Sequence, residues 1–178
     1  MALKTYRAAD ATVRVFVFRD GLARALGHDI ELDVASFTLE VDVDARTLNA
    51  RFDTSSLRTL HAVKDGAPDR SALSASDRET IDEAVAEKVL DARRHPEVRF
   101  VARKVDVDTA AGRGRVEGEL TLHGVTRGIA CDFARDASGA VACEVVLDQV
   151  AFGIEPFRAF GGVLKVKQNV VVRVRIQP

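Results

Sequence analysis

Residues 117–133 read Glu-Gly-Glu-Leu-Thr-Leu-His-Gly-Val-Thr-Arg-Gly-Ile-Ala-Cys-Asp-Phe, and this stretch decides the fold. Its first arm alternates apolar or small residues with polar ones, and its second arm does the same after a turn that contains Gly124 and Gly128. Such alternation is typical of half-buried antiparallel strands. The apolar face of this predicted hairpin carries Leu120, Leu122, Ile129, Cys131 and Phe133. A lone hairpin is marginally stable in water, so further strands must complete it.

Most of the remaining chain follows the same period of two and gives about eight strands. The predicted strands outside the hairpin cover residues 12–19, 30–34, 37–43, 48–52, 98–107, 141–147 and 163–176. The parity of the apolar residues changes near Ala35 and again between Ala102 and Val105, which predicts bends or bulges. Between the first two strands, residues 20–27 break the alternation and predict one helical turn that ends at Gly27. Regularly spaced strands with short turns indicate a sandwich or a closed barrel, and the parity changes favour the barrel.

One α-helix is predicted in the middle of the chain. Residues 54–74 are polar and contain Gly and Pro, so they read as a long connection. Ser76 and Glu79 then have the spacing of a capping box, and apolar residues follow at helical intervals. The helix is expected over about 77–94 and should stop at His95-Pro96, because the residue before proline avoids the helical region.

Length and charge restrict the class of protein. The chain has 178 residues, which fits one domain over 1–178, and its formal net charge is −1 with basic and acidic residues interspersed. Neither a nucleic-acid surface nor a dedicated anionic-membrane surface is implied. No apolar run approaches the roughly 18 residues of a membrane span, and the N-terminus lacks the apolar core of a signal peptide. We therefore expect a soluble cytoplasmic protein, with a periplasmic or secreted one as the alternative.

The residues most often used in chemistry are few and scattered. Cys131 and Cys143 face each other across neighbouring strands if the turn at 136–139 leaves an odd number of unpaired residues, and we expect two buried thiols rather than a disulfide. The four histidines occur singly, without metal-ligand spacing, so we expect no metal site and no catalytic site. Those histidines are His28, His61, His95 and His123. His28 and His123 lie at predicted strand ends, where a histidine can face the barrel mouth.

The chain resembles the YceI-like family, a lipocalin-like family of polyisoprenoid-binding barrel proteins. Four blocks carry the resemblance along nearly the whole chain. They are Asp10 to Val15, the helix exit His95-Pro96-Glu97-Val98-Arg99-Phe100, the hairpin Gly118-Glu119-Leu120-Thr121-Leu122-His123-Gly124-Val125-Thr126-Arg127, and Phe152-Gly153 with the last strand. The resemblance implies an extended eight-stranded antiparallel β-barrel with the helix in its mid-chain connection. Two positions depart from the family pattern: residues 64–76 are polar here, and Ala151 precedes Phe152.

The resemblance also implies a function. Family members hold a long isoprenoid chain in an apolar tunnel, and several are dimers, so we expect an apolar small-molecule ligand and a homodimer. We expect no cofactor other than a bound isoprenoid or other lipid. The residues expected to line the barrel interior and mouth are Val13, Val15, Val17, Leu32, Phe52, Phe100, Leu120, Leu122, Ile129, Cys131, Phe133, Val145, Phe152, Phe157, Phe160 and Val172.

Three functions follow from these patterns. The first is non-enzymatic binding, transport or sequestration of an isoprenoid quinone, a polyprenyl phosphate or a fatty-acid-like lipid. The second is a structural or dimerisation barrel with a side-chain-filled core, which the second apolar face at Phe16 and Phe18 suggests. The third is a lipid-modifying enzyme that uses a histidine at the barrel mouth. In the Phe-rich segment 152–162, Glu155 and Arg158 either guard a pocket entrance or lie beside a plug of Phe side chains.

Overall fold

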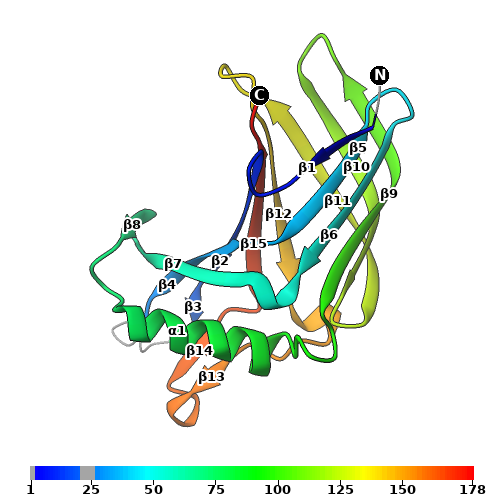
Figure 1. The fold of residues 1–178 in the computed structure, drawn as a ribbon. Helices are drawn as coiled ribbons and strands as arrows, with labels where there is room; N and C mark the ends of the chain where they lie inside the picture. The colour runs from blue at the N-terminus through cyan, green and yellow to red at the C-terminus, as the bar shows by residue number, and fades with distance from the viewer. Residues whose placement is uncertain (1–2, 21–26) are drawn as a thin grey trace.

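The predicted hairpin lies in the middle of a 12-stranded antiparallel sheet in the computed structural model, which describes residues 3–20 and 27–178 (Figure 1). Its arms are β10 (Arg113–Leu122) and β11 (Val125–Arg135). The other strands are β1 (Lys4–Tyr6), β2 (Ala11–Val17), β4 (Asp29–Val34), β5 (Phe37–Asp42), β6 (Thr47–Asp53), β7 (Leu57–Lys64), β8 (Ala67–Asp69), β9 (Glu97–Asp108), β12 (Val141–Asp148) and β15 (Asn169–Ile176). Neighbouring strands follow the order β1-β5-β6-β9-β10-β11-β12-β15-β2-β4-β7-β8.

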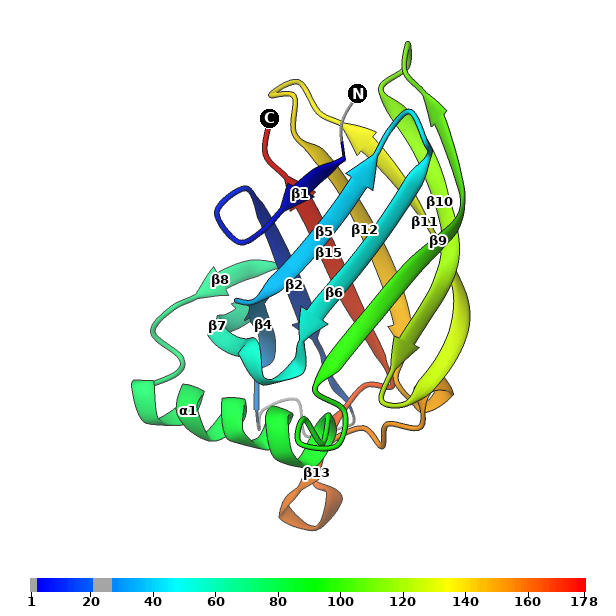
Figure 2. The same cartoon turned by 45° about the vertical axis from the view of Figure 1, so that its right-hand side comes forward.

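The prediction of a closed eight-stranded barrel is wrong, because the sheet is open and its edge strands are β1 and β8. The reason is a corner in one long hairpin. β4 and β7 pair with each other beside β2, whereas their continuations β5 and β6 pair with each other beside β9. The sheet therefore curls round and bends at this hairpin (Figure 2). The predicted parity change near Ala35 is confirmed as the break between β4 and β5.

A buried polar network holds this corner. Ser56 accepts the Ala35 N–H at its carbonyl, 3.1 Å away, and the Ser36 N–H at its hydroxyl, 3.0 Å away. Thr54 is almost fully buried, and its hydroxyl donates to the His95 carbonyl at 2.7 Å. The corner, which includes the 3₁₀ turn η1 (Thr54–Ser56), is thereby fixed to the chain that enters β9.

The prediction of a strand-free connection over 54–74 is wrong, because β7 and β8 lie inside it. Two buried polar side chains of β7 obscure the period-two pattern. The Thr59 hydroxyl donates to the carboxylate of Asp82, and His61 Nε2 lies 2.8 Å from Glu31 Oε2. Leu60 is an extra residue at a register shift, so the parity of β7 changes at its middle.

The mid-chain helix is shorter than predicted. α1 (Ala75–Ala84) is followed by the π-helical segment η2 (Val85–Val89), so the helical region ends five residues before Arg94. The capping box is formed by Ser74 and Asp77, not by Ser76 and Glu79. Asp82 ties the helix to β7, because its carboxylate accepts the Thr59 N–H at 2.6 Å and the Thr59 hydroxyl at 2.7 Å. In the described part of the chain, no helix is long and apolar enough to cross a bilayer.

The turn of the central hairpin contains only His123 and Gly124, whereas Gly128 lies within β11. Both turn residues have positive φ, 52° and 77°, as a type I′ turn requires. The His123 ring packs on His95 with 4.3 Å between ring centroids, so the hairpin tip rests against the chain that enters β9.

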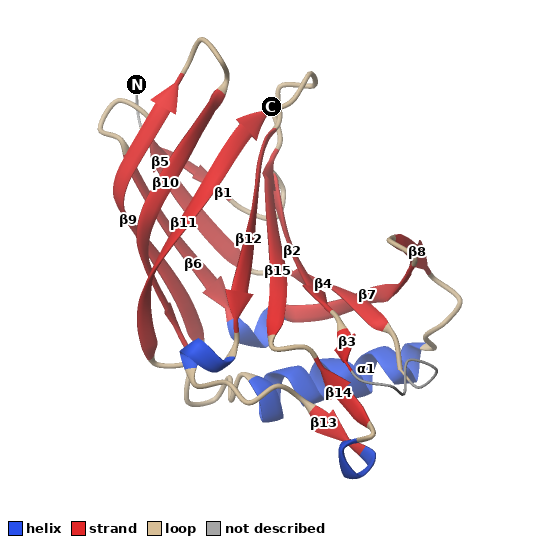
Figure 3. Cartoon of the chain, turned by 180° about the vertical axis from the view of Figure 1, so that it is seen from behind, coloured by secondary structure: helices blue, strands red, loops and turns tan. Residues whose placement is uncertain are grey.

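The long final strand predicted over 163–176 is interrupted. β15 belongs to the main sheet, but β14 (Leu164–Val166) pairs with β13 (Arg158–Ala159) and β3 (Arg19–Asp20) in a second sheet of three strands. The 3₁₀ turns η3 (Val150–Phe152) and η4 (Phe160–Gly162) flank β13. Figure 3 shows the β13–β14 hairpin projecting beyond the curled sheet near α1. The helical turn predicted over 20–27 falls on residues 21–26, which lie outside the described residues.

The curled sheet has a seam between β11 and β12. These strands pair only where Phe133–Arg135 meet Val141–Cys143. β10 and β11, in contrast, pair from Arg113 to Leu122, and β12 pairs with β15 along its whole length. The seam is the weakest junction described between long neighbouring strands of the wall.

Gly118→Ala should destabilise the protein. A Cβ at Gly118 would lie closer than 3.0 Å to the Val101 carbonyl oxygen and to two Phe100 ring carbons. We expect the free energy of unfolding to fall by about 1–3 kcal/mol, the usual cost of overpacking. Denaturant titration measures the change. Gly128→Ala is the control, because a Cβ there would have no atom within 4 Å, and an equal loss in both variants would contradict the prediction.

His123→Asn should reduce the acid sensitivity of the fold. Burial and the neighbouring His95 lower the pKa of His123 below its ordinary value of 6.5, while Asp91 opposes the shift. The unfolded chain then binds the proton more readily, so stability falls as the pH drops through 6.5 towards the lowered value. Asn tolerates the positive φ of the turn.

The measurement is the melting temperature at about pH 7.5 and about pH 5.5, which bracket the ordinary histidine pKa. The decline between these values should be smaller for His123→Asn than for the parent chain. His28→Asn controls for the loss of a histidine elsewhere. An unchanged decline in His123→Asn would show that the turn histidine does not contribute.

Candidate ligand-binding cavity

A cavity of about 1230 Å³ lies within the curl of the main sheet. Its wall is overwhelmingly apolar because the strands turn one parity of side chains inwards. In β2 the alternate residues Val13, Val15 and Val17 face the cavity, and in β4 Ile30 and Leu32 do so. The alternation that predicted the strands thus also builds the lining.

Fifteen of the sixteen residues predicted to line the interior lie on the wall of this cavity. They are Val13, Val15, Val17, Leu32, Phe52, Phe100, Leu120, Leu122, Ile129, Cys131, Phe133, Val145, Phe157, Phe160 and Val172. Their position is a geometric fact, and their contact with a ligand stays a prediction. The parity change in β9 keeps the wall continuous, because a register shift at Arg103 lets Phe100 and Val105 both face inwards.

Phe152 is the predicted lining residue that is not part of the wall. Its side chain is only 3% exposed and belongs to the buried cluster of the core. Parity does not apply to Phe152, because it lies in the turn η3 and not in a strand. The three Phe residues of this segment therefore have three different environments: Phe152 is buried, Phe157 lines the cavity, and Phe160 borders the cavity but is 81% exposed.

One end of the cavity is covered by α1 and η2. Figures 1 and 2 both show the helix across this end of the sheet, with the two termini at the other end. The helix contributes Ile81 and Ala84 to the wall, and η2 contributes Val85 and Val89. These residues were not predicted to line the cavity, although their helical spacing was the available signal: an amphipathic helix in a β-domain turns its apolar face to the interior.

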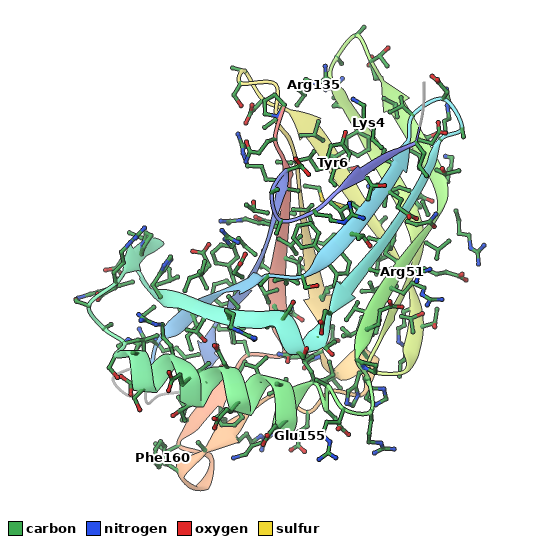
Figure 4. All side chains as sticks on the ribbon, viewed as in Figure 1. Lys4, Tyr6, Arg51, Arg135, Glu155 and Phe160 are labelled. Atoms are coloured by element: carbon green, nitrogen blue, oxygen red, sulfur yellow. The ribbon has the colours of Figure 1, made fainter. Side chains whose placement is uncertain are left out.

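Polar side chains on the wall gather towards the two ends. At the end near the termini, Lys4, Tyr6 and Arg135 lie on the wall, and Figure 4 shows them on neighbouring parts of that end. At the helix end, His28 and Lys165 lie on the wall. The middle of the wall is therefore apolar, and polar side chains are available at either end to face a polar group.

The two cysteines are free thiols; Cys131 is buried, as expected, whereas Cys143 is only partly buried. Phe133, not Cys131, is the direct partner of Cys143 across the seam, so the two cysteines are diagonal neighbours. Their thiols interact, and this hydrogen bond together with burial raises the pKa of Cys131 far above its ordinary value. Cys131 is therefore a protonated, weakly reactive wall residue at neutral pH.

The histidines have different surroundings. His61 is buried beside Glu31 on the outer side of the sheet, the rings of His95 and His123 pack against each other at a tilt of 49°, and His28 lies on the cavity wall. Within residues 3–20 and 27–178, no group of three His, Cys, Asp or Glu side chains is arranged to hold a metal ion.

The predicted roles of two other features are not supported by geometry. Glu155 and Arg158 form no ion pair among the described residues, so they do not make a paired guard at an entrance. Phe16, which suggested a second apolar face, lies under the Arg173 guanidinium at 4.4 Å from the ring centroid. Arg173 in turn forms an ion pair with Glu144 at 2.6 Å, so a charged pair covers Phe16.

Comparison with solved structures shows the same fold in three proteins. Burkholderia cenocepacia BcnA has a TM-score of 0.64 and 15% identity, with 93% of this chain and 94% of BcnA covered. A polyisoprenoid binding domain from Saccharophagus degradans, implicated in plant cell wall breakdown, has a TM-score of 0.60 and 12% identity over 100% and 99% of the two chains. The Campylobacter jejuni YCEI protein has a TM-score of 0.61 and 12% identity over 89% and 90%.

Sequence comparison gives the family directly. None of the curated protein sequences compared matches the chain. The sequence model of the YceI-like domain matches residues 9–177, which is nearly the whole chain. This match agrees with the blocks at Asp10, His95, Gly118 and Phe152 on which the resemblance rests. The chain belongs to the YceI-like domain family.

Proposed function

We propose that the protein binds a long apolar amphiphile in its cavity and acts as a non-enzymatic carrier or sequestering protein. The observation that carries the proposal is the cavity of about 1230 Å³ lined by the inward parity of the curled sheet. This volume exceeds the roughly 300–1,000 Å³ of common small-molecule pockets. It argues against the alternative of a barrel whose core is filled by side chains.

The apolar wall provides enough free energy for binding. Burying about fifteen ligand carbons contributes roughly 12 kcal/mol at about 0.8 kcal/mol per methylene. Association costs about 4–15 kcal/mol. At the lower end of this cost about 8 kcal/mol remains, which corresponds to a complex of about micromolar affinity through the tail alone, and the head group adds selectivity through the polar ends of the cavity.

An isoprenoid is the ligand class that we favour, and a fatty-acid-like lipid is the alternative. The similarity to a polyisoprenoid binding domain supports an isoprenoid quinone or a polyprenyl phosphate. The middle of the wall supports binding without catalysis, because aliphatic and aromatic side chains such as Phe100, Leu120 and Val145 line it. Carboxylates nearer the ends, such as Asp53 and Asp77, are engaged in capping hydrogen bonds.

The purified chain should yield a bound amphiphile. Organic-solvent extraction followed by mass spectrometry should find a prenylated or long-chain molecule in a near-stoichiometric amount. The control is the same extraction on protein unfolded and refolded after lipid removal, which should be empty and then reload from added prenyl lipid. Failure of the refolded protein to take up any prenyl or acyl chain would overturn the proposal.

Val145→Phe should weaken binding by filling the cavity. Val145 lies on the wall, so a larger side chain takes the space of about two methylenes and costs about tenfold in affinity at about 0.8 kcal/mol each. Val146→Phe is the matched control, because Val146 is the next residue of β12 and is 61% exposed. Titration with a fluorescent prenyl or acyl probe measures both affinities. Equal affinities would show that the ligand does not occupy this part of the cavity.

A further inference from the structure

The tip of the β13–β14 hairpin exposes the largest apolar side chain on the described surface. Phe160 is 81% exposed, and Val163 in the same tip is 48% exposed. Figure 4 shows Phe160 at the far end of the hairpin, outside the curled sheet. An exposed Phe at a protruding tip indicates a surface that is covered by something else when the protein works.

The backbone of the tip holds Phe160 outwards. Phe160, Gly161 and Gly162 have consecutive positive φ values of 52°, 65° and 88°. A bulky residue seldom adopts positive φ, and such strain concentrates at functional sites. A Cβ at Gly161 would meet no atom within 4 Å, so space beside the tip is open.

Cations surround this apolar tip. Arg158 and Lys165 are direct cross-strand partners in β13 and β14, and like charges in that position repel each other. Lys167 follows on the same chain, and Glu155 is the one carboxylate within residues 155–167. In the neighbouring strand β3, Asp20 is the cross-strand partner of Lys165, and Arg19 beside it balances that negative charge. Three cations and one anion leave two net positive charges over residues 155–167. Among the described residues, none of these three cations forms an ion pair, so an external anion would relieve their repulsion.

The tip is also part of the cavity wall. Phe157, Phe160, Leu164 and Lys165 all belong to the lining. A surface that covered the tip would therefore lie directly at the helix end of the cavity.

We propose that the β13–β14 tip docks on an anionic lipid bilayer, with Phe160 and Val163 inserted at the boundary between head groups and acyl chains. Arg158 and Lys165 then face lipid phosphates, which replaces their mutual repulsion with attraction. An apolar tip flanked by cations fits a bilayer surface better than a second copy of this chain, because two copies would bring the cations together. The net charge of −1 conceals this surface, since the positive charge is local to one hairpin.

Phe160→Trp provides a direct reporter, because the chain contains no tryptophan. The probe is vesicles made of equal parts of phosphatidylglycerol and phosphatidylcholine, added to protein from which lipid has been removed. Docking should shift the emission of the introduced tryptophan to the blue, and Val146→Trp on the outer face of β12 should show no shift. This assay needs no ligand in the cavity. Vesicle docking can therefore fail while ligand binding succeeds, and ligand binding can fail while vesicle docking succeeds.

Charge and insertion are tested separately by vesicle co-sedimentation of the tryptophan-free chain. We expect Arg158→Glu with Lys165→Glu to lower the vesicle partition coefficient at least about tenfold, and Phe160→Ser to do the same. Circular dichroism confirms that each variant is folded. The proposal would be overturned if Phe160→Trp gave no blue shift with vesicles, or if Val146→Trp gave the same shift. It would also be overturned if the emission of Phe160→Trp were shifted without vesicles and light scattering gave the mass of a dimer, because the tip would then contact a second copy of the chain.

Discussion

The corner at Ser56 is the constraint on which the rest of the structure depends. Hydrogen bonds from the Ala35 and Ser36 amides to Ser56, and from the Thr54 hydroxyl to the His95 carbonyl, fix one hairpin in a bent form. Because the hairpin bends, its β5–β6 half extends the part of the sheet that contains β9. Its β4–β7 half extends the part that contains β2. The sheet can then enclose a cavity without closing its ladder of hydrogen bonds. A straight hairpin would leave the two flanks apart and the interior open to water.

The alternation of apolar and polar residues predicted most of the cavity wall but not the corner, and both outcomes have the same physical reason. A strand with one buried face shows its apolar residues at alternate positions, so residues such as Val13, Leu120 and Val145 could be placed from sequence. At the corner and in β7 several buried side chains are polar, and their partners lie 20 to 41 residues away. Thr59 and His61 therefore resembled loop residues, and the count of strands and the closed barrel were wrong.

The helix illustrates a different limit of prediction. Its existence followed from apolar spacing and a capping signal, but Ser74 and not Ser76 caps it. Both serines have an acidic residue three positions later, so local sequence could not distinguish them. The choice is made by Asp82, which must reach Thr59 in β7. Tertiary contact thus sets the frame of the helix, and with it which apolar residues cover the cavity.

The short seam between β11 and β12 gives the molecule mechanical anisotropy. The neighbouring pairs β10–β11 and β12–β15 have longer ladders, so we expect each side of the seam to resist deformation better than the seam itself. Deformation concentrates where only Phe133–Arg135 and Val141–Cys143 are paired, because the fewest hydrogen bonds resist it there. The corner at Ser56 joins the two halves at the opposite side. We therefore expect the girth of the cavity to change more readily than its length, which the strands fix.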